Sequence, residues 1–292
     1  MNLTRENLES LFVAINATYN RGLRQVWDGF EKFAMTVNSS TALNRYPVML
    51  MTGAMREWVG ERVVNELSGK SVDVVNRDFE HTEGILRNDL EDDNFGFFAP
   101  LFEGIGAEAG NLWGRLASEA LETPGNWADG AAFFGSRKIG KATINNAVSG
   151  ALTVANYETA RSRMMGFTAA DGKTPLGLVP NLLVVPPSLE STAKTIFKTD
   201  LVASGGSTVS NIHKDEVEIL LDPFLTGSDW YLMCTSRGLK PLVVQKRKAG
   251  SLQRWDKDSD ECVKNHRRYE YGIDHRGAAA AIAPHLIVKG VA

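Results

Sequence analysis

Residues 135–142, GSRKIGKA, come within one residue of a phosphate-binding P-loop. The P-loop pattern requires Ser or Thr directly after its lysine, because that hydroxyl holds the magnesium ion. Ala142 occupies the position instead. The preceding pair, Phe133 and Phe134, is too short for the buried strand that should lead into such a loop. A nucleotide-dependent enzyme that uses the loop from Gly135 to Ala142 is therefore kept only as an alternative.

Two other segments resemble binding motifs and lack the required context. Residues 104–110, GIGAEAG, are one residue too long for a dinucleotide fingerprint and lie inside a predicted helix, not after a buried strand. The acidic run at residues 91–93 has neither the glycine turn nor the distal glutamate of a calcium loop. Acidic residues before a helix are favoured by its dipole, which accounts for this run.

The histidines and cysteines form no recognisable catalytic or metal-binding pattern. The five histidines are scattered over residues 81–285, and the two cysteines, Cys234 and Cys262, lie far apart. A structural zinc site needs about four ligands at closer spacing, and a disulfide framework needs more cysteines. We therefore predict no cofactor, no metal and no catalytic residue, and a reducing compartment.

Composition indicates a folded, water-soluble chain. The 292 residues include 43% apolar and 23% charged side chains, with a net charge of −3. No apolar run approaches the ~18 residues of a membrane span, and the polar start lacks the features of a signal peptide. Residues 1–135 hold 20 acidic and 11 basic side chains, whereas residues 136–292 hold 15 and 21. This asymmetry would suit head-to-tail contact between copies, although a chance distribution over solvated faces explains it equally.

The first third of the chain is predicted to contain two helices and an extended segment. Residues 4–34 have helical apolar spacing, with Gly22 as a break or kink. Residues 36–76 mix charges with large apolar groups without a period, which fits either an extended arm buried by a partner or an ordinary surface hairpin. Residues 77–91 are predicted to be a long polar strand. A helix should then run from Pro100 to about Leu121.

That second helix contains four glycines, and each costs about 1 kcal/mol relative to alanine in a helix interior. Four such residues imply a face that another backbone approaches closely. The residues predicted to pack in this way are Gly104, Gly106, Gly110 and Gly114.

The second half of the chain mixes short helices and strands. The predicted helices are residues 145–165 and 188–198, the latter with Ser188 as its cap. The predicted strands are residues 182–185, 217–221, 230–235, 242–245, 269–283 and 286–288. Because these strands are not regularly separated by helices, the predicted fold class is α+β.

The order of these features resembles the major head subunit of Mu-like phages and prophages. The segment Arg56-Glu57-Trp58-Val59-Gly60 is followed by a Phe-Glu segment at residues 79–80 and the acidic run at residues 91–93. The resemblance is strongest over residues 5–135 and continues through residues 220–223 and 269–290. One departure is the basic loop from residue 135, where the family usually has an acidic, His-Pro-containing stretch.

The resemblance implies the Hong Kong 97-type capsid fold. The implied parts are an N-terminal arm (1–35), an extended loop (36–76), a peripheral domain (77–140 and 241–292) with a spine helix, and an axial domain (141–240). The extended loop would reach over a neighbouring subunit. The residues predicted to take part in that contact are Arg56, Glu57, Trp58, Arg62 and Lys70.

The implied function is that of a major capsid protein. Copies would assemble in the bacterial cytoplasm, as hexamers and pentamers, into the icosahedral head shell of a virion. The implied partners are a separate scaffolding protein, a portal, a possible decoration protein, and packaged DNA held non-specifically on the inner face. A cellular nanocompartment shell of the encapsulin type is an alternative with the same fold.

Some relatives with this fold link their subunits covalently, through a lysine on the extended loop and an asparagine of the next subunit. This reaction needs a desolvated, neutral lysine. Lys70 lies between Gly69 and Ser71, where we expect its amine to be exposed and charged. The sequence therefore predicts a shell held by non-covalent contacts.

Overall fold

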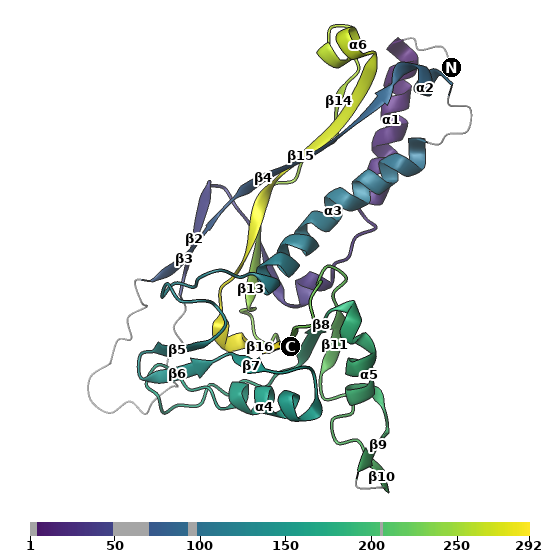
Figure 1. The fold of residues 1–292 in the computed structure, drawn as a ribbon. Helices are drawn as coiled ribbons and strands as arrows, with labels where there is room; N and C mark the ends of the chain where they lie inside the picture. The colour runs from purple at the N-terminus through teal and green to yellow at the C-terminus, as the bar shows by residue number, and fades with distance from the viewer. Residues whose placement is uncertain (1–4, 49–69, 93–97, 205–206) are drawn as a thin grey trace.

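The computed structural model describes residues 5–48, 70–92, 98–204 and 207–292 (Figure 1). A long, narrow upper part carries helices α1 and α3 beside a ribbon of strands, and a broader lower part carries a second sheet with helices α4 and α5. The C-terminus lies in the lower part and the N-terminal helix in the upper one.

The upper part is built on α3 (Phe98–Glu122), with α1 (Arg5–Gly22) packed along it. Beside them lies a five-stranded sheet in which β15 is central and pairs with β13, β14 and β4. Its strands are β1 (Ala34–Asn38), β4 (Arg77–Leu86), β13 (Leu242–Lys248), β14 (Gln253–Trp255) and β15 (Arg268–Ala281). The short helices at or near this part are η1 (Gly29–Lys32), α2 (Arg87–Glu91) and α6 (Glu261–His266).

The lower part is built on a sheet of order β11-β8-β12-β16-β7. Its strands are β7 (Ala147–Ser149), β8 (Leu182–Val185), β11 (Glu218–Leu221), β12 (Trp230–Met233) and β16 (Ile287–Val291). The helices of this part are α4 (Val154–Met165), η2 (Pro187–Leu189), α5 (Glu190–Lys198) and η3 (Pro284–Leu286). Strand β8 and strand β12 are buried at every position, which explains their unbroken apolar sequences.

Three two-stranded hairpins extend from these sheets. They are β2 (Leu43–Pro47) with β3 (Ser71–Val75), β5 (Ser136–Ile139) with β6 (Ala142–Asn145), and β9 (Leu201–Ser204) with β10 (Ser207–Ser210). An isolated two-stranded hairpin is only marginally stable in water. Each of the three therefore depends on what anchors its base.

The described residues form two hydrophobic clusters. The smaller one joins α1 and α3 to β15, and Tyr19, Phe102 and Tyr271 are its largest fully buried members. The rings of Phe102 and Tyr271 meet edge to face, with centroids 5.1 Å apart. The larger cluster fills the lower part and continues upward to Trp113 and Leu121 of α3. Because α3 contributes to both clusters, it connects the two parts of the molecule.

Most predicted elements form close to their expected positions. The helix expected over residues 100–121 is α3, and the strand expected at residues 182–185 is β8. The predicted break at Gly22 is confirmed, because α1 ends there. Among residues 36–76, positions 49–69 lie outside the described residues.

Three element predictions were wrong. The strand expected over residues 77–91 stops at Leu86, and α2 follows it. The helix expected from residue 145 starts only at Val154, because β7 pairs with β16 and Thr153 then caps the helix by accepting a bond from the Asn156 amide. Ser188 does not cap α5; it lies in η2, and its hydroxyl bonds the Gly227 carbonyl.

The nucleotide-binding alternative for residues 135–142 fails on local structure. A P-loop connects a buried strand to a helix and wraps phosphates with its backbone amides. Here the segment forms the hairpin β5–β6, and its second glycine and its lysine, Gly140 and Lys141, make the turn. The Arg137 side chain is buried and bonds Asp129 and two backbone carbonyls. It is therefore committed to holding this loop.

Within the described ranges, no group of three or more His, Cys, Asp or Glu side chains is placed to hold a metal ion. No described helix is long and apolar enough to cross a membrane.

Candidate assembly surfaces

Helices α1 and α3 meet through a reciprocal glycine contact. A Cβ atom at Gly106 would lie 2.2 Å from the Tyr19 carbonyl oxygen, and one at Gly22 would lie 2.0 Å from the Glu103 carbonyl oxygen. At Gly110 a Cβ would meet Val26 at 2.2 Å, and at Gly114 it would meet Trp27 at 3.0 Å. The glycines thus allow two backbones to approach far closer than alanines would.

Gly104 departs from the pattern predicted for the four glycines. A Cβ added there meets nothing within 4 Å, because this side of α3 faces away from α1. Within the subunit, close packing therefore accounts for Gly106, Gly110 and Gly114 but not for Gly104.

Polar contacts fix α1 and the following turn on α3. The Arg21 guanidinium donates to Glu103, with its Nε 3.0 Å from Oε2, and the Gln25 amide donates to the other oxygen. These bonds lower the pKa of Glu103, with that from Arg21 the largest cause. The Trp27 amide donates to Asn111 Oδ1 at 3.0 Å. The N-terminal helix is therefore bound to its own subunit.

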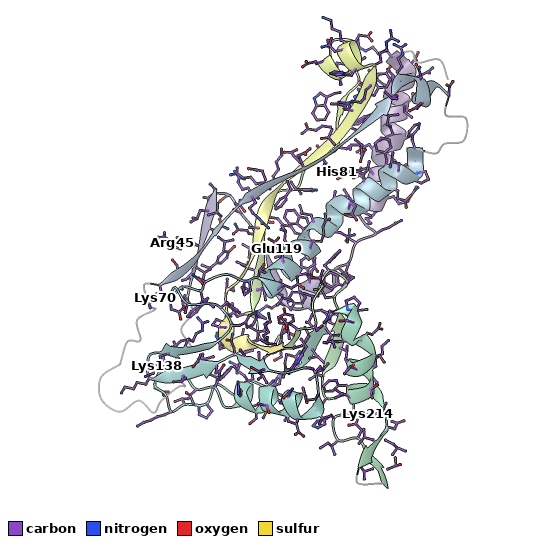
Figure 2. All side chains as sticks on the ribbon, viewed as in Figure 1. Arg45, Lys70, His81, Glu119, Lys138 and Lys214 are labelled. Carbon is purple, nitrogen blue, oxygen red and sulfur yellow. The ribbon has the colours of Figure 1, made fainter. Side chains whose placement is uncertain are left out.

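Only part of the predicted loop contact can be located. Arg56, Glu57, Trp58 and Arg62 lie outside the described residues. Lys70 is exposed directly before β3, at the end of hairpin β2–β3 away from β1 and β4, where its carbonyl accepts a bond from the Val48 amide (Figure 2). The two strands of this hairpin are joined by an ion pair between Arg45 and Asp73, whose side chains share two hydrogen bonds. This ion pair lowers the pKa of Asp73.

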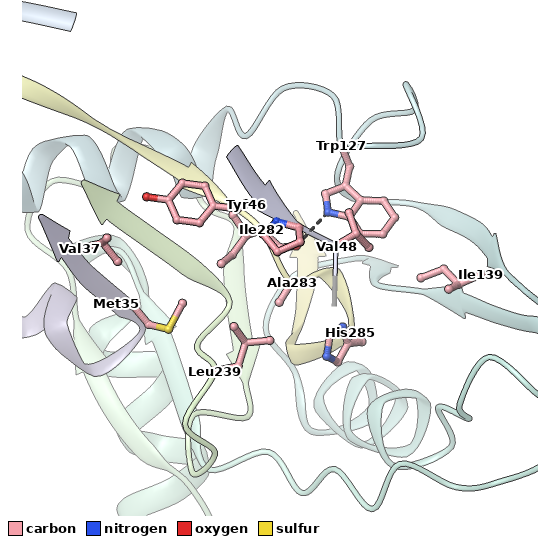
Figure 3. Close-up of a pocket in the computed structure, with 11 residues that line it drawn as sticks. Met35, Val37, Tyr46, Val48, Trp127, Ile139, Leu239, Ile282, Ala283 and His285 are labelled. Atoms are coloured by element: carbon pink, nitrogen blue, oxygen red, sulfur yellow. Dashed lines mark hydrogen bonds between the residues drawn. The ribbon is translucent and has the colours of Figure 1, made fainter. Parts of the chain in front are cut away.

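An apolar cavity of about 280 Å³ opens beside the Pro47 end of this hairpin (Figure 3). Tyr46 and Val48 form one wall, and Trp127 and His285 contribute others. The Trp127 indole donates to the Ile282 carbonyl at 2.9 Å, so its ring is held in place. The cavity lies where the hairpin meets the body of the subunit, and its shape depends on how the hairpin is oriented.

A buried carboxyl group joins α3 to the lower sheet. Asp222 is fully buried after β11, and its Oδ2 lies 2.6 Å from Ser118 Oγ. The single Ser118 hydroxyl hydrogen also has the Gly114 carbonyl within 3.0 Å and cannot serve both acceptors. A proton on Asp222 resolves this, and it agrees with burial raising the pKa of this carboxyl group.

Hairpin β9–β10 projects from the lower end of the molecule (Figure 1). Its strands pair only with each other among the described strands. Apolar side chains remain open to solvent here, with Leu201 59% and Ile212 82% exposed, and Val209 is exposed as well. This is a surface that a partner would cover.

The base of this hairpin is held by a polar cluster. Asn211 donates through its side-chain amide to the carbonyls of Ile196 and Thr199. His213 Nδ1 lies 2.9 Å from Glu216 Oε2, and its Nε2 lies 3.1 Å from Glu158 Oε1. Sequence reasoning treated His213 as scattered, because Glu158 is 55 positions away and nothing local indicates the pairing.

Comparison with known proteins identifies the family. The model of the Mu-like prophage major head subunit gpT matches residues 8–149, 140–225 and 226–287. A curated relative, the major capsid protein of Escherichia phage Mu, is 26% identical over 308 aligned positions, covering 77% of this chain and all of that protein.

Solved structures show the same fold. The procapsid subunit of bacteriophage JBD30 superposes with a TM-score of 0.61 at 23% identity, over 99% of this chain and 76% of that one. The JBD30 capsid decorated with minor capsid protein trimers gives 0.58 at 23% identity, over 68% of this chain and 91% of that one.

The encapsulin of Synechococcus elongatus is more distant, with a TM-score of 0.50 at 11% identity over 91% of this chain and 88% of that one. The phage relatives thus outweigh the nanocompartment alternative. The α+β architecture is that of the Hong Kong 97-type capsid fold. The chain belongs to the Mu-like prophage major head subunits, the major capsid proteins that form the head shell of the virion.

Proposed function

We propose that four parts of the chain have distinct roles in the assembly of this shell. They are an arm (1–35), an extended loop (36–76), a peripheral domain (77–140 and 241–292) and an axial domain (141–240). The two sheets support the division into peripheral and axial domains, since the upper sheet uses mostly residues 77–86 and 242–281 and the lower one mostly residues 147–233. Strand β1 (Ala34–Asn38) modifies the division, because it spans the boundary between arm and loop and pairs with β13 of the upper sheet. Strand β16 also modifies it, because it lies in the lower sheet between β12 and β7.

The axial domains of neighbouring subunits contact one another within each hexamer and pentamer, and hairpin β9–β10 forms the central part of that contact. The observation that carries this proposal is the exposed apolar surface of Leu201 and Val209, on a hairpin that pairs only with itself within the described chain, and of Ile212 in the turn that follows it. Charged neighbours at its base, such as Lys198 with Asp215, already form ion pairs. The apolar surface is therefore what remains for a second copy to cover.

The further partners follow from the family. A separate scaffolding protein and a portal act during assembly, and packaged DNA touches the inner face without sequence specificity. A decoration protein is a further candidate partner. The decorated JBD30 capsid supports this candidate, because minor capsid protein trimers sit on a related shell.

The role is structural, without catalytic chemistry. The β5–β6 hairpin supports this view by replacing the nucleotide loop. The arm and the extended loop add contacts between subunits, with Arg56, Glu57, Trp58, Arg62 and Lys70 as the proposed loop residues.

The role of hairpin β9–β10 is tested by replacing Ile212 with aspartate. A charged group at the centre of an apolar contact loses its hydration when the contact forms, so Ile212→Asp should form few particles. Ile212→Val keeps the apolar character and serves as the control. Particle yield is measured by sedimentation and the fold of the subunit by circular dichroism. Normal particle yield from Ile212→Asp would place the contact elsewhere.

A further inference from the structure

A fully buried glutamine ties hairpin β2–β3 to the body of the subunit. Gln245 lies on β13, between β1 and β15, and is 0% exposed. Its Nε2 donates to the Val74 carbonyl at 3.0 Å and to Asn76 Oδ1 at 2.8 Å. Its Oε1 accepts a bond from the Tyr46 hydroxyl at 3.0 Å. One side chain thus bonds both strands of the hairpin and the residue that follows it.

Asn76 extends this network to the other end of the hairpin. Its Nδ2 donates to Ser39 Oγ at 3.0 Å and to the Thr41 carbonyl at 2.8 Å. Ser39 Oγ in turn lies 2.9 Å from Asn44 Oδ1. Both amide hydrogens of Gln245 and both of Asn76 therefore have acceptors. A hairpin turned away from β13 would break the three bonds that Gln245 makes to it.

The ends of the hairpin are also held by the chain itself, because β3 continues through Asn76 into β4 and the Ser39 amide donates to the Lys246 carbonyl of β13. The hairpin strands pair only with each other among the described strands, and Leu43 and Val75 expose their apolar side chains. Val48 and Val74 are buried against the body, but apolar contacts are not directional. Hydrogen bonds are directional, and a rotated hairpin would leave buried polar groups without partners. The polar network therefore adds directional bonds that hold the middle of the hairpin against β13.

We propose that Gln245 is a positioning residue that holds hairpin β2–β3 at one angle, so that the extended loop is presented correctly to the neighbouring subunit. The assembly part of this inference rests on the proposed role of residues 36–76. The angle also shapes the apolar cavity, because the Tyr46 ring lines it while the hydroxyl points away (Figure 3).

The first test replaces Gln245 with leucine, which removes all three bonds at similar volume. The matched control is Gln253→Leu, since Gln253 is an exposed glutamine on β14 of the same sheet. A pair of spin labels at Leu43→Cys and Glu108→Cys reports the angle, because both positions are exposed whereas the native cysteines are buried. Particle yield and the melting temperature of unassembled subunits are measured in parallel.

Gln245→Leu should give a broad distribution of distances between the two spin labels. Its yield of shells should be lower by about tenfold or more, because the free energy of one lost buried hydrogen bond is enough for a change of that size. The melting temperature should fall by a few degrees, because the Val74 carbonyl, the Asn76 side chain and the Tyr46 hydroxyl lose a buried partner, while both hydrophobic clusters stay intact. Gln253→Leu should match the wild type in all three measurements. An unchanged, narrow distribution in Gln245→Leu would overturn the inference.

A second variant separates positioning from loss of packing. Gln245→Glu keeps the acceptor for Tyr46 but turns a carboxylate oxygen toward the Val74 carbonyl and Asn76 Oδ1, which are both acceptors. In acid the glutamate side chain carries a proton, which it can donate to one of these two acceptors. The distribution of distances between the two spin labels should therefore be broader than that of the wild type at neutral pH. In acid it should become as narrow as that of the wild type. A pH-independent distribution would contradict the network.

Failure of the inference is distinguishable from failure of the proposed loop role. A broad distribution with normal particle yield would show that Gln245 sets the angle but that assembly does not need it. That result would overturn only the assembly part of the inference, because the proposed role of residues 36–76 is tested separately by the particle yield of Trp58→Ala.

Discussion

The contact between α1 and α3 predicts opposite effects for two neighbouring glycine-to-alanine changes. Either change should gain about 1 kcal/mol from helix propensity. At Gly104 the new methyl group meets nothing within 4 Å, so the gain should remain. At Gly106 it would lie 2.2 Å from the Tyr19 carbonyl oxygen, where ordinary contact begins at 3.4 Å. Helix α1 must therefore retreat by 1.2 Å, the difference between these distances.

This retreat has an estimable cost. Overpacking typically costs about 1–3 kcal/mol, and a clash with backbone, which cannot rotate away, belongs at the upper end. A cost of about 3 kcal/mol less the propensity gain of about 1 leaves Gly106→Ala about 2 kcal/mol less stable than the wild type. Since Gly104→Ala gains about 1, the two variants should differ by about 3 kcal/mol, or about 6 °C at about 2 °C per kcal/mol.

The assay is thermal unfolding of unassembled subunits, followed by circular dichroism. Gly104→Ala should melt at or above the wild-type temperature and Gly106→Ala clearly below it. Equal melting temperatures, or a lower one for Gly104→Ala, would refute the reciprocal glycine contact.

Gly110→Leu should give insoluble or unassembled protein, because Val26 already occupies that space; a soluble, assembling variant seen by sedimentation would contradict this. Burial raises the pKa of Asp222, so the wild type should lose stability relative to Asp222→Asn as the pH rises above about 4, where the unfolded carboxyl group ionises. Asp222→Asn should remove that loss, as denaturant titrations across pH would show, and an unchanged pH profile would place the charge elsewhere. Trp58→Ala should lower particle yield without changing circular dichroism, whereas Trp255→Ala should assemble; normal yield from Trp58→Ala would count against a loop contact there. On denaturing electrophoresis, mature particles should give one band near 32 kDa, and a ladder of linked multimers would disprove non-covalent assembly.

Features determined locally could be predicted from the sequence. Strand β8 follows from an unbroken apolar run that ends at Pro186, and α3 follows from its apolar spacing with Pro100 near its start. The four glycines pointed to a braced helix, and three of them do face α1 or the turn after it. That Gly104 faces away could not be seen, because it depends on which side of α3 the first helix covers.

Features determined by distant partners could not be predicted. Gln245 bonds side chains and a carbonyl 169 to 199 positions earlier in the chain, and nothing in its own strand distinguishes it from a surface glutamine. The late start of α4 has a similar cause. Residues 147–149 pair with β16 at the far end of the chain, which removes them from the expected helix.

The central claim, that copies of this chain build a shell, is tested most directly by negative-stain electron microscopy of the purified protein. The account predicts closed shells, tubes or rings of hexamers formed by the protein itself. A stable monomer with a ligand-filled cleft, unchanged across protein concentration and salt, would contradict it.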